Sequence, residues 1–218
     1  MKYERIERAT FLERPNRFIA YARIAGKQET IHVKNTGRCA ELLVPEAEIF
    51  VQESDNPERK TKWDLIGVRK GDRLINMDSQ IPNKVVEEWL RAGNLFLEPV
   101  AVRPETTYGN SRFDFYVESG ETKAFIEVKG VTLEEDGVVR FPDAPSERAV
   151  KHVEELIRAK KEGYDAYVFL VIQMKGVRYF TPNMDTQPEF GEVLKKARAA
   201  NAFPYRTFKV EDYFEKTY

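Results

Sequence analysis

The 218-residue sequence predicts a two-domain protein of mixed α+β and α/β class, in which a small N-terminal OB-like β-barrel precedes a mixed sheet flanked by helices. Three observations lead to this prediction. The chain is longer than one average domain. Its first part alternates short strand-like stretches with turn-forming residues. Its second part mixes helical and strand-like periods, as α/β domains do. We place the domains at residues 1–81 and 82–218.

The composition limits the class of protein and of site. No run approaches the roughly 18 apolar residues of a membrane span. The N-terminus lacks the apolar core of a secretory signal, and one cysteine cannot form an internal disulfide, so we expect a cytoplasmic protein without membrane contact. One cysteine and two histidines are too few for a Cys/His zinc site, which leaves oxygen ligands for any metal. The net charge of −1 gives no global basic field that would indicate nucleic acid.

The first domain is predicted from strand-like stretches at short, regular spacing. They are separated by the turn-rich pieces NTGR, VPEA and SDNPERK. This spacing is typical of a small barrel or sandwich, and a five-stranded barrel of the OB type is the preferred architecture. The predicted strands are Arg17–Gly26, Glu29–Asn35, Ala47–Ser54 and Trp63–Asn76.

The second domain begins where the hydrophobic period changes to that of a helix, which Gly93 can end. Its apolar face consists of Val85, Val86, Trp89 and Leu90. Further along, Tyr164–Met174 is apolar enough to be a strand buried on both faces. The other predicted elements are strands at Leu95–Val102 and Phe203–Val210, a hairpin at Ser111–Gly130, and helices at about 146–162 and 189–200.

The hairpin has charges clustered toward one end. If Ser119–Thr122 forms the loop, the apolar residues of both strands share one face, from Phe113 opposite Val128 to Val117 opposite Ala124. The same register places Asp114 opposite Glu127, and Arg112 opposite Lys129. Directly opposed carboxylates repel by up to about 1 kcal/mol in a sheet, and by more when buried. A positive charge is therefore expected beside them.

Two interpretations of these charges are open. In the first, Arg112 pairs diagonally with Glu127, and Asp114 with Lys129, as a surface ladder of small energetic effect. In the second, a divalent cation lies between the carboxylates and completes its shell with water, a backbone carbonyl and substrate phosphate, which suits Mg²⁺.

Longer motifs favour the second interpretation. An Asp followed across a hairpin by Glu-x-Lys resembles the core of PD-(D/E)xK nucleases. The pieces HVKNTG, YGNSRFDF, IEVKGVTL and FPDAPSERAVKHVEEL resemble the sugar fermentation stimulation protein A (SfsA) family over almost the whole chain. This resemblance implies an OB-like domain joined to a PD-(D/E)xK nuclease-like domain, and an association with DNA. The family name refers to a regulatory effect, which is not a biochemical activity.

The resemblance also implies roles for residues of the second domain. Asp114 and Glu127 would be ligands of Mg²⁺ or Mn²⁺, with the Val128 carbonyl and Glu88 as further ligands. Lys129 would orient the attacking water or offset charge in the transition state. The usual Pro-Asp is Phe-Asp here, but the carboxylate of Asp114 is retained. The literal Pro-Asp at 142–143 follows the Glu-x-Lys and cannot supply the first ligand.

We expect DNA as the partner, with RNA as an alternative and a homodimer left open. A metal-dependent nuclease is the expected function, and a non-catalytic DNA-binding regulator on a degenerate nuclease fold is the alternative. NTGR is also an ordinary turn, and the charged face of the helix at 146–162 is also an ordinary solvated face. The residues predicted to contact DNA are Arg17, Lys34, Asn35, Thr36, Gly37, Arg38, Arg112, Arg148, Lys151 and His152.

Overall fold

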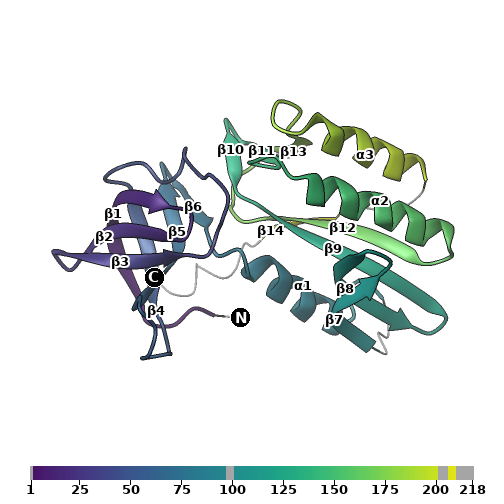
Figure 1. Cartoon of the computed structure of the whole chain (residues 1–218), viewed down its shortest axis with the longest axis horizontal. Helices are drawn as coiled ribbons and strands as arrows, with labels where there is room; N and C mark the ends of the chain where they lie inside the picture. Colours follow the sequence, from purple (N-terminus) through teal and green to yellow (C-terminus); the bar gives the residue numbers. More distant parts are fainter. Residues whose placement is uncertain (1, 97–100, 201–205, 210–218) are drawn as a thin grey trace.

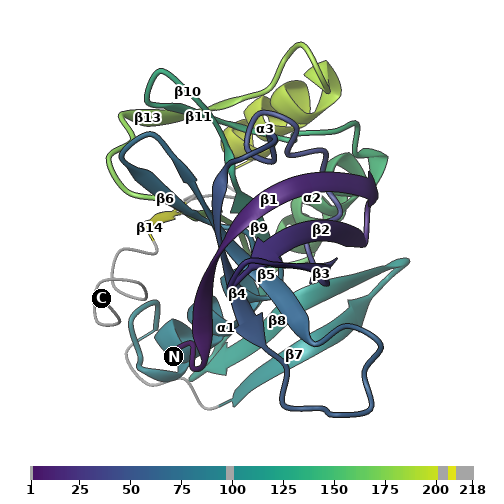
Figure 2. The same ribbon diagram turned by 90° about the vertical axis from the view of Figure 1, so that its left-hand side faces the viewer.

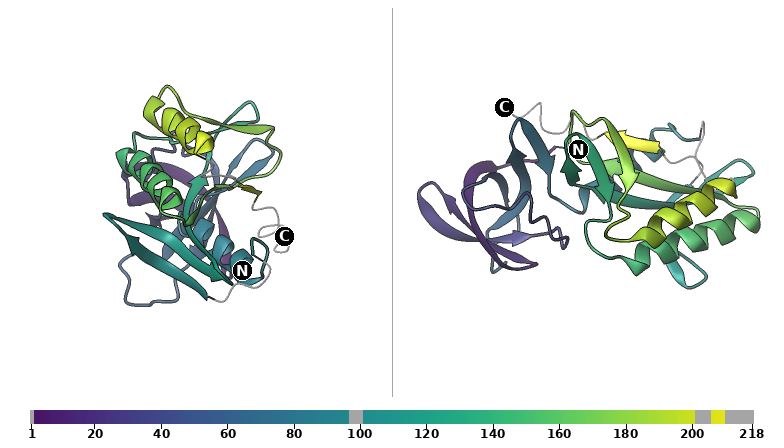
Figure 3. Two further views of the ribbon diagram at one scale, coloured as in Figure 1. Left: turned by 90° about the vertical axis from the view of Figure 1, so that its right-hand side faces the viewer. Right: turned by 90° about the horizontal axis from the view of Figure 1, so that it is seen from above.

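The computed structural model describes residues 2–96, 101–200 and 206–209. A β-barrel and a sheet flanked by helices lie side by side along the long axis of the molecule (Figure 1; Figure 3, right). The polypeptide passes from one to the other between β6 (Arg73–Asn76) and α1 (Ile81–Arg91). The expected combination of an N-terminal barrel with a C-terminal mixed sheet is confirmed.

The N-terminal sheet has the strand order β3-β2-β1-β4-β5-β6, and a parallel pairing of β3 with β5 closes it into a barrel of five strands (Figure 2). The predicted stretch Trp63–Asn76 forms two strands because the chain turns at Gly71, where φ is +57°. The barrel strands are β1 (Ile6–Asn16), β2 (Ile19–Ile24), β3 (Lys27–Val33), β4 (Glu48–Glu53) and β5 (Trp63–Lys70).

The first strand was absent from the sequence prediction. Along β1 only Ala9 and Phe11 are buried, and the pairing with β2 shifts between Phe11 and Glu13 and again before Asn16. Such bulges and the many charged side chains interrupt the alternation on which strand prediction depends.

The C-terminal sheet has the order β14-β12-β9-β8-β7, and β9 lies at its centre. Helix α1 covers one face, whereas α2 (Glu147–Lys161) and α3 (Pro188–Ala199) cover the other (Figure 1; Figure 3, left). On the α1 side, Val86 and Leu90 pack against Phe115, Val128 and Phe169. The sheet strands are β7 (Ala101–Tyr108), β8 (Ser111–Ser119), β9 (Thr122–Val131), β12 (Asp165–Ile172) and β14 (Arg206–Lys209).

Several predicted elements differ from those observed. Of the strand expected at Leu95–Val102, Ala101 and Val102 lie in β7, Leu95 and Phe96 are not in a strand, and residues 97–100 lie outside the described residues. Of the last predicted strand, 206–209 is confirmed, and the rest of it lies outside the described residues. A small second sheet, absent from the prediction, consists of β10 (Leu133–Glu135), β11 (Val138–Phe141) and β13 (Tyr179–Pro182).

The helices begin and end where the sequence indicates. Helix α1 has Pro82 in its first turn and ends at Arg91, before Gly93 with φ of +77°. The Ser146 side chain accepts a hydrogen bond from Ala149 N and caps α2. Within the described residues, no helix is both long enough and apolar enough to cross a membrane.

Helix α1 approaches the sheet closely at Gly130 of β9. A Cβ atom at this position would lie 2.9 Å from Pro82 Cγ and 2.3 Å from Gln173 Oε1. Any side chain at residue 130 would therefore displace the Gln173 side chain and push against Pro82 at the start of α1. This close packing fixes the N-terminal end of α1 above the end of the hairpin.

The two domains are joined by specific polar contacts. Asn76 N donates to Gln173 O at 2.8 Å. The buried Glu134 carboxylate lies 3.1 Å from both Lys70 Nζ and Arg73 Nη1. At a second point, Arg38 donates to the Asp143 carbonyl at 2.6 Å. The barrel is therefore held against the second domain by contacts at both ends of the interface.

Candidate metal and nucleic-acid site

The hairpin forms in the predicted register. Phe115 pairs with Ile126 and Glu118 with Lys123, while Ser119 and Thr122 also pair, so the turn has two residues instead of four. The regular pairing of β8 with β9 stops at Phe115. Beyond it, Asp114 Oδ2 accepts a hydrogen bond from Val128 N at 2.7 Å. The Asp114 carboxylate thus accepts the hydrogen bond of a β9 backbone amide at the point where the regular pairing of the two strands stops.

The prediction that the apolar residues of the hairpin share one face is wrong at Phe113. Phe115 and Val117 pack on the α1 side of the sheet, as alternation requires. Phe113 instead packs on the α2 side, with its ring centroid 5.4 Å from Phe125 and 5.9 Å from His152. The alternation of β8 therefore shifts at Asp114, where the side chain bonds the neighbouring backbone.

Asp114 is half-buried and is held from two sides. In addition to the Val128 amide, Asn83 Nδ2 of α1 donates to Asp114 Oδ1 at 2.7 Å. Burial, together with the nearby charge of Glu127, raises the pKa of Asp114 to about 6. The two hydrogen bonds oppose this shift without cancelling it. A cation placed beside Asp114 would offset the unfavourable charge.

Glu127 lies deeper, at 2 % exposure. Burial alone would raise the pKa of its carboxyl group, but His152 and Lys129 outweigh that effect and lower it. Glu127 Oε1 contacts Lys129 Nζ and lies 2.6 Å from His152 Nδ1. The other oxygen, Oε2, is buried and has no hydrogen-bond partner among the described residues. A buried carboxylate oxygen without a hydrogen-bond partner is suited to bind a metal ion.

The surface-ladder interpretation is wrong. Arg112 pairs with Glu105 of β7 at 2.7 Å, and Lys129 pairs with Glu127 of its own strand. Neither diagonal pair of the ladder forms, because the strands separate at Asp114. The carboxylates are also no part of a solvated face, since helices cover both faces of this sheet.

The two carboxylates suit a divalent ion that keeps part of its water shell, as Mg²⁺ does. The hydrogen-bond donors around them hold the carboxylates in place. Among the residues that the structure describes, no third Asp, Glu, His or Cys joins them in a metal-binding cluster. The structure does not bring Glu88 to this group: Glu88 is exposed on α1, and this helix presents Asn83 to Asp114. The role of the Val128 carbonyl stays a prediction.

Four of the residues predicted to contact DNA meet in one cleft of about 520 Å³ beside the carboxylates: Arg112, Arg148, Lys151 and His152. Lys151 Nζ donates to the Asn110 carbonyl at 3.0 Å, and Arg148 Nε donates to His152 Nε2 at 3.3 Å. His152 is buried, at 4 % exposure, and its ring forms the inner wall of the cleft and contacts Glu127. Its contact with DNA stays a prediction.

A second cleft, of about 480 Å³, lies between the barrel and the loop before α2. It is lined by five further residues of the predicted DNA contact: Arg17, Asn35, Thr36, Gly37 and Arg38. Lys34 is not among them. Its ammonium lies 2.9 Å from Asp78 and 3.4 Å from Asp64, at 16 % side-chain exposure. These carboxylates pair with its charge inside the protein, and its contact with DNA stays a prediction.

Comparison with known proteins agrees with this architecture. The SfsA N-terminal OB domain matches residues 12–77, and the sugar fermentation stimulation protein RE domain matches residues 80–210. The chain belongs to the SfsA family. It is 62 % identical to the sugar fermentation stimulation protein homolog of Clostridium beijerinckii over 91 % of this chain and 88 % of the relative. Identity to the homolog of Desulfitobacterium hafniense is 60 %, over 90 % of this chain and 86 % of the relative.

A solved SfsA structure has the same fold. The structure of Pyrococcus furiosus SfsA in complex with Ca²⁺ superimposes with a TM-score of 0.82 at 26 % identity, covering 96 % of this chain and 88 % of that chain. That structure is a complex with Ca²⁺, a divalent ion that takes oxygen ligands. For this chain, Mg²⁺ or Mn²⁺ stays a prediction.

Three residues that position the site were missed by sequence reasoning. Asn83 supports Asp114, as described above. The Arg14 guanidinium donates to four carbonyl groups of the loops at 17 and 35–38, at 2.7 to 2.9 Å. Asp143 Oδ2 accepts from Cys39 N at 3.0 Å. Asp143 belongs to the literal Pro-Asp pair that the sequence analysis set aside as a ligand.

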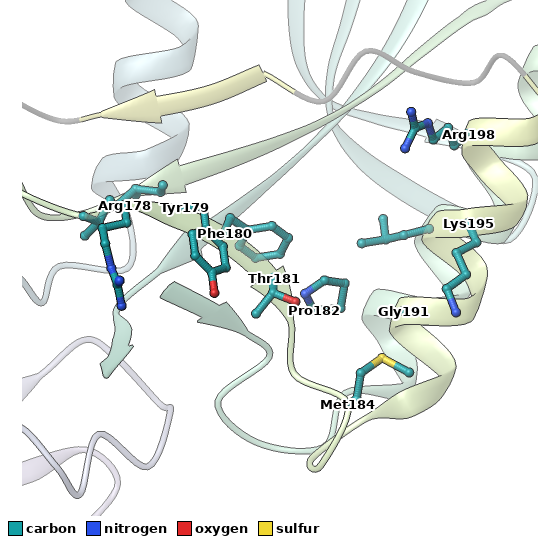
Figure 4. Close-up of a pocket in the computed structure, with 12 residues that line it drawn as sticks. Arg178, Tyr179, Phe180, Thr181, Pro182, Met184, Gly191, Lys195 and Arg198 are labelled. Carbon is teal, nitrogen blue, oxygen red and sulfur yellow. The ribbon is translucent and has the colours of Figure 1, made fainter. Parts of the chain in front are cut away.

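A further cavity, of about 590 Å³, opens between β13 and α3. Tyr179 and Pro182 of β13 and Met184 of the loop after it line one side, and Lys195 of α3 lies on the other (Figure 4). None of the predicted site residues lines this cavity. It is therefore separate from the carboxylates and the two basic clefts.

Proposed function

We propose that this SfsA chain binds DNA and hydrolyses its phosphodiester bonds with a divalent metal ion, Mg²⁺ or Mn²⁺, held by Asp114 and Glu127. The observation that carries this proposal is the unpartnered, buried Oε2 of Glu127 beside Asp114, whose pKa is raised by burial and by the charge of Glu127. A protein that only binds DNA gains nothing from two such carboxylates, because they repel phosphate.

The protein side chains have distinct tasks in this proposal. When bound, the metal would supply Lewis-acid polarisation of the phosphate and activation of a water molecule. Asn83 and the Val128 amide hold the Asp114 carboxylate in place, and His152 holds Glu127. The Lys129 ammonium has three N–H donors, of which one suffices for Glu127, so the others can stabilise negative charge on the phosphate.

Charge also supports DNA as the partner. The cleft at Arg17 and Arg38 contains Gly130, the residue after Lys129, and the other cleft contains His152, which contacts Glu127. Basic side chains thus flank the carboxylates on two sides, and a phosphate backbone is the ligand that such a distribution favours. RNA has the same backbone charge and is the alternative substrate.

A second candidate function is a non-catalytic DNA-binding regulator. It is favoured by the contact of Lys129 with Glu127, which offsets one carboxylate without any metal, and by the missing third ligand among the described residues. Such a protein would bind DNA through the same two clefts but would leave it intact.

Cleavage assays separate the two functions. End-labelled single- and double-stranded DNA and RNA are incubated with the protein in Mg²⁺, Mn²⁺ or EDTA, and shortened products are resolved on a gel. We expect products only with metal, and a rate lower by orders of magnitude for Asp114→Asn. The matched control is Asp72→Asn, which neutralises an exposed carboxylate in the β5–β6 turn. A wild-type rate for Asp114→Asn would disprove the assignment of this hairpin.

DNA binding in EDTA gives a second, independent measurement. Without metal, neutralising Asp114 removes repulsion of the backbone of about 1 kcal/mol. Asp114→Asn is therefore expected to bind DNA as tightly as the wild type, or several-fold more tightly. If both proteins bind but neither cuts any nucleic acid, the regulator becomes the better assignment.

A further inference from the structure

The cleft beside the carboxylates contains a buried polar group that the proposed function does not use. Ser111, at 5 % exposure, lines this cleft together with Arg112, Arg148 and Lys151. Its hydroxyl oxygen is buried and has no hydrogen-bond partner among the described residues. Buried hydroxyl groups are normally hydrogen-bonded, so an unpartnered one at the base of a basic cleft indicates a ligand.

We propose that this cleft, lined by Asn110–Arg112 and by Glu147, Arg148, Lys151 and His152, is a binding site for a phosphate group of a nucleic acid strand. The Ser111 hydroxyl would donate the buried hydrogen bond. This proposal rests on the proposed function, and it assigns a second phosphate subsite next to the one at Asp114 and Glu127.

The charged groups of the cleft match a phosphate. Lys151 uses one of three N–H donors on the Asn110 carbonyl, and Arg148 uses one of five on His152, so donors remain for an anion. Arg112 and Glu105 form an exposed pair, which is weak and can exchange Glu105 for a phosphate. Glu147 is the one acidic residue that lines the cleft, against three cations.

The position of His152 connects the cleft to the carboxylates. One ring nitrogen, Nδ1, lies 2.6 Å from Glu127, and the other accepts from Arg148 in the cleft. The two subsites are thus separated by a single imidazole ring. A strand whose scissile phosphate lies at the carboxylates would place a neighbouring phosphate in the cleft, and the phosphate there would fix the position of the strand.

Phosphate binding is measured by calorimetry in EDTA, with inorganic phosphate and thymidine 5′-monophosphate as probes. We expect Lys151→Gln and Ser111→Ala each to weaken binding about five- to tenfold, the loss typical of one charge-assisted or one buried hydrogen bond. Lys151 is exposed, so its variant keeps the fold even if Ser111→Ala does not. The control is Lys123→Gln at the far end of the same hairpin, which we expect to bind like the wild type.

Oligonucleotides then distinguish a strand from free phosphate. A short single-stranded DNA should lose affinity in Lys151→Gln by a similar factor, whereas the Lys123→Gln control should not. If the probes bind but the oligonucleotide is insensitive to Lys151, the cleft takes only small phosphates and the proposal is overturned. Equal phosphate affinity in all variants, or no binding to the wild type, also overturns it.

The outcome is separable from that of the nuclease assays. Asp114→Asn leaves the cleft residues in place, so Lys151→Gln should weaken phosphate binding by the same factor in the Asp114→Asn protein as in the wild type. Phosphate and strand binding through Lys151, together with an uncleaved substrate, would keep this subsite and reject the nuclease. Cleavage of the substrate, with no effect of Ser111→Ala or Lys151→Gln on binding, would support the nuclease and reject this subsite.

Discussion

Replacing Asp114 by Asn should stabilise the metal-free protein at neutral pH. The pKa of Asp114 is raised from 3.8 to about 6, so the folded protein holds its proton to higher pH than the unfolded chain does. The free energy of unfolding of the wild type therefore falls as pH rises from about 4 to 6, and the full penalty persists above 6. At roughly 1.4 kcal/mol per pKa unit this penalty reaches about 3 kcal/mol.

The variant keeps the side-chain shape and an oxygen that can accept from Val128 N. Its amide nitrogen then faces Asn83, whose side chain must turn so that its oxygen accepts from that nitrogen, in a weaker, uncharged hydrogen bond. We therefore expect a net gain of about 1 to 3 kcal/mol at pH 8 in EDTA, vanishing below pH 4. Urea unfolding over this pH range measures it, with Asp72→Asn as the control. Adding Mn²⁺ should stabilise the wild type more than the variant. A variant less stable than the wild type at pH 8 would refute the reasoning.

Three further predictions concern metal, interface and DNA. Glu127→Gln should weaken Mn²⁺ binding at least about tenfold in calorimetry, because a ligand charge is lost. The control Glu88→Gln should bind Mn²⁺ like the wild type. If Glu127→Gln binds Mn²⁺ as tightly as the wild type, Glu127 is not a ligand. Glu134→Gln should reduce the free energy of unfolding at pH 7 by about 2 kcal/mol, below the usual value for a buried pair because Lys70 and Arg73 are one-third exposed. Burial would raise the pKa of Glu134, but the Gly137 amide, Lys70 and Arg73 outweigh it and lower the pKa from its ordinary value of 4.5. The stability difference should therefore shrink as pH falls below that value, and a difference that stays constant in acid would contradict the assignment. DNA affinity should fall with salt by a log–log slope of about 0.9 per phosphate bound, and an affinity independent of salt would exclude the basic clefts as the binding surface.

Local patterns were enough to predict the frame of the site. Alternation in the hairpin gave the register of β8 and β9, because slipping by one residue would turn every apolar side chain outward. The helical period and Gly93 gave α1, and the apolar stretch around Val168 gave the buried strand β12. These features depend on neighbours in the sequence or on one periodic face.

The missed features depend on residues distant in the sequence. No local signal shows that Lys34 meets Asp64 and Asp78, or that His152 turns from a charged helix face into the protein toward Glu127. The shift of Phe113 to the other face follows from one side-chain-to-backbone hydrogen bond, that of Asp114. Patterns in the sequence indicate which residue types a site contains, but partner choice is decided by tertiary packing.

The central place of β9 in its sheet has a consequence for the order in which a ribosome completes the protein. Every strand of the closed barrel has been synthesised once Lys70 is reached, but the parallel partner of β9, β12, ends only at Ile172. At about 5 to 20 residues per second, the intervening stretch of roughly 100 residues takes about 5 to 20 s to make. In the later part of that interval, from the synthesis of Glu127 until that of His152, Asp114 and Glu127 lie on a nascent hairpin without the histidine or the parallel strand that surround them in the folded protein. The barrel can thus exist on the ribosome for seconds before the carboxylate centre does.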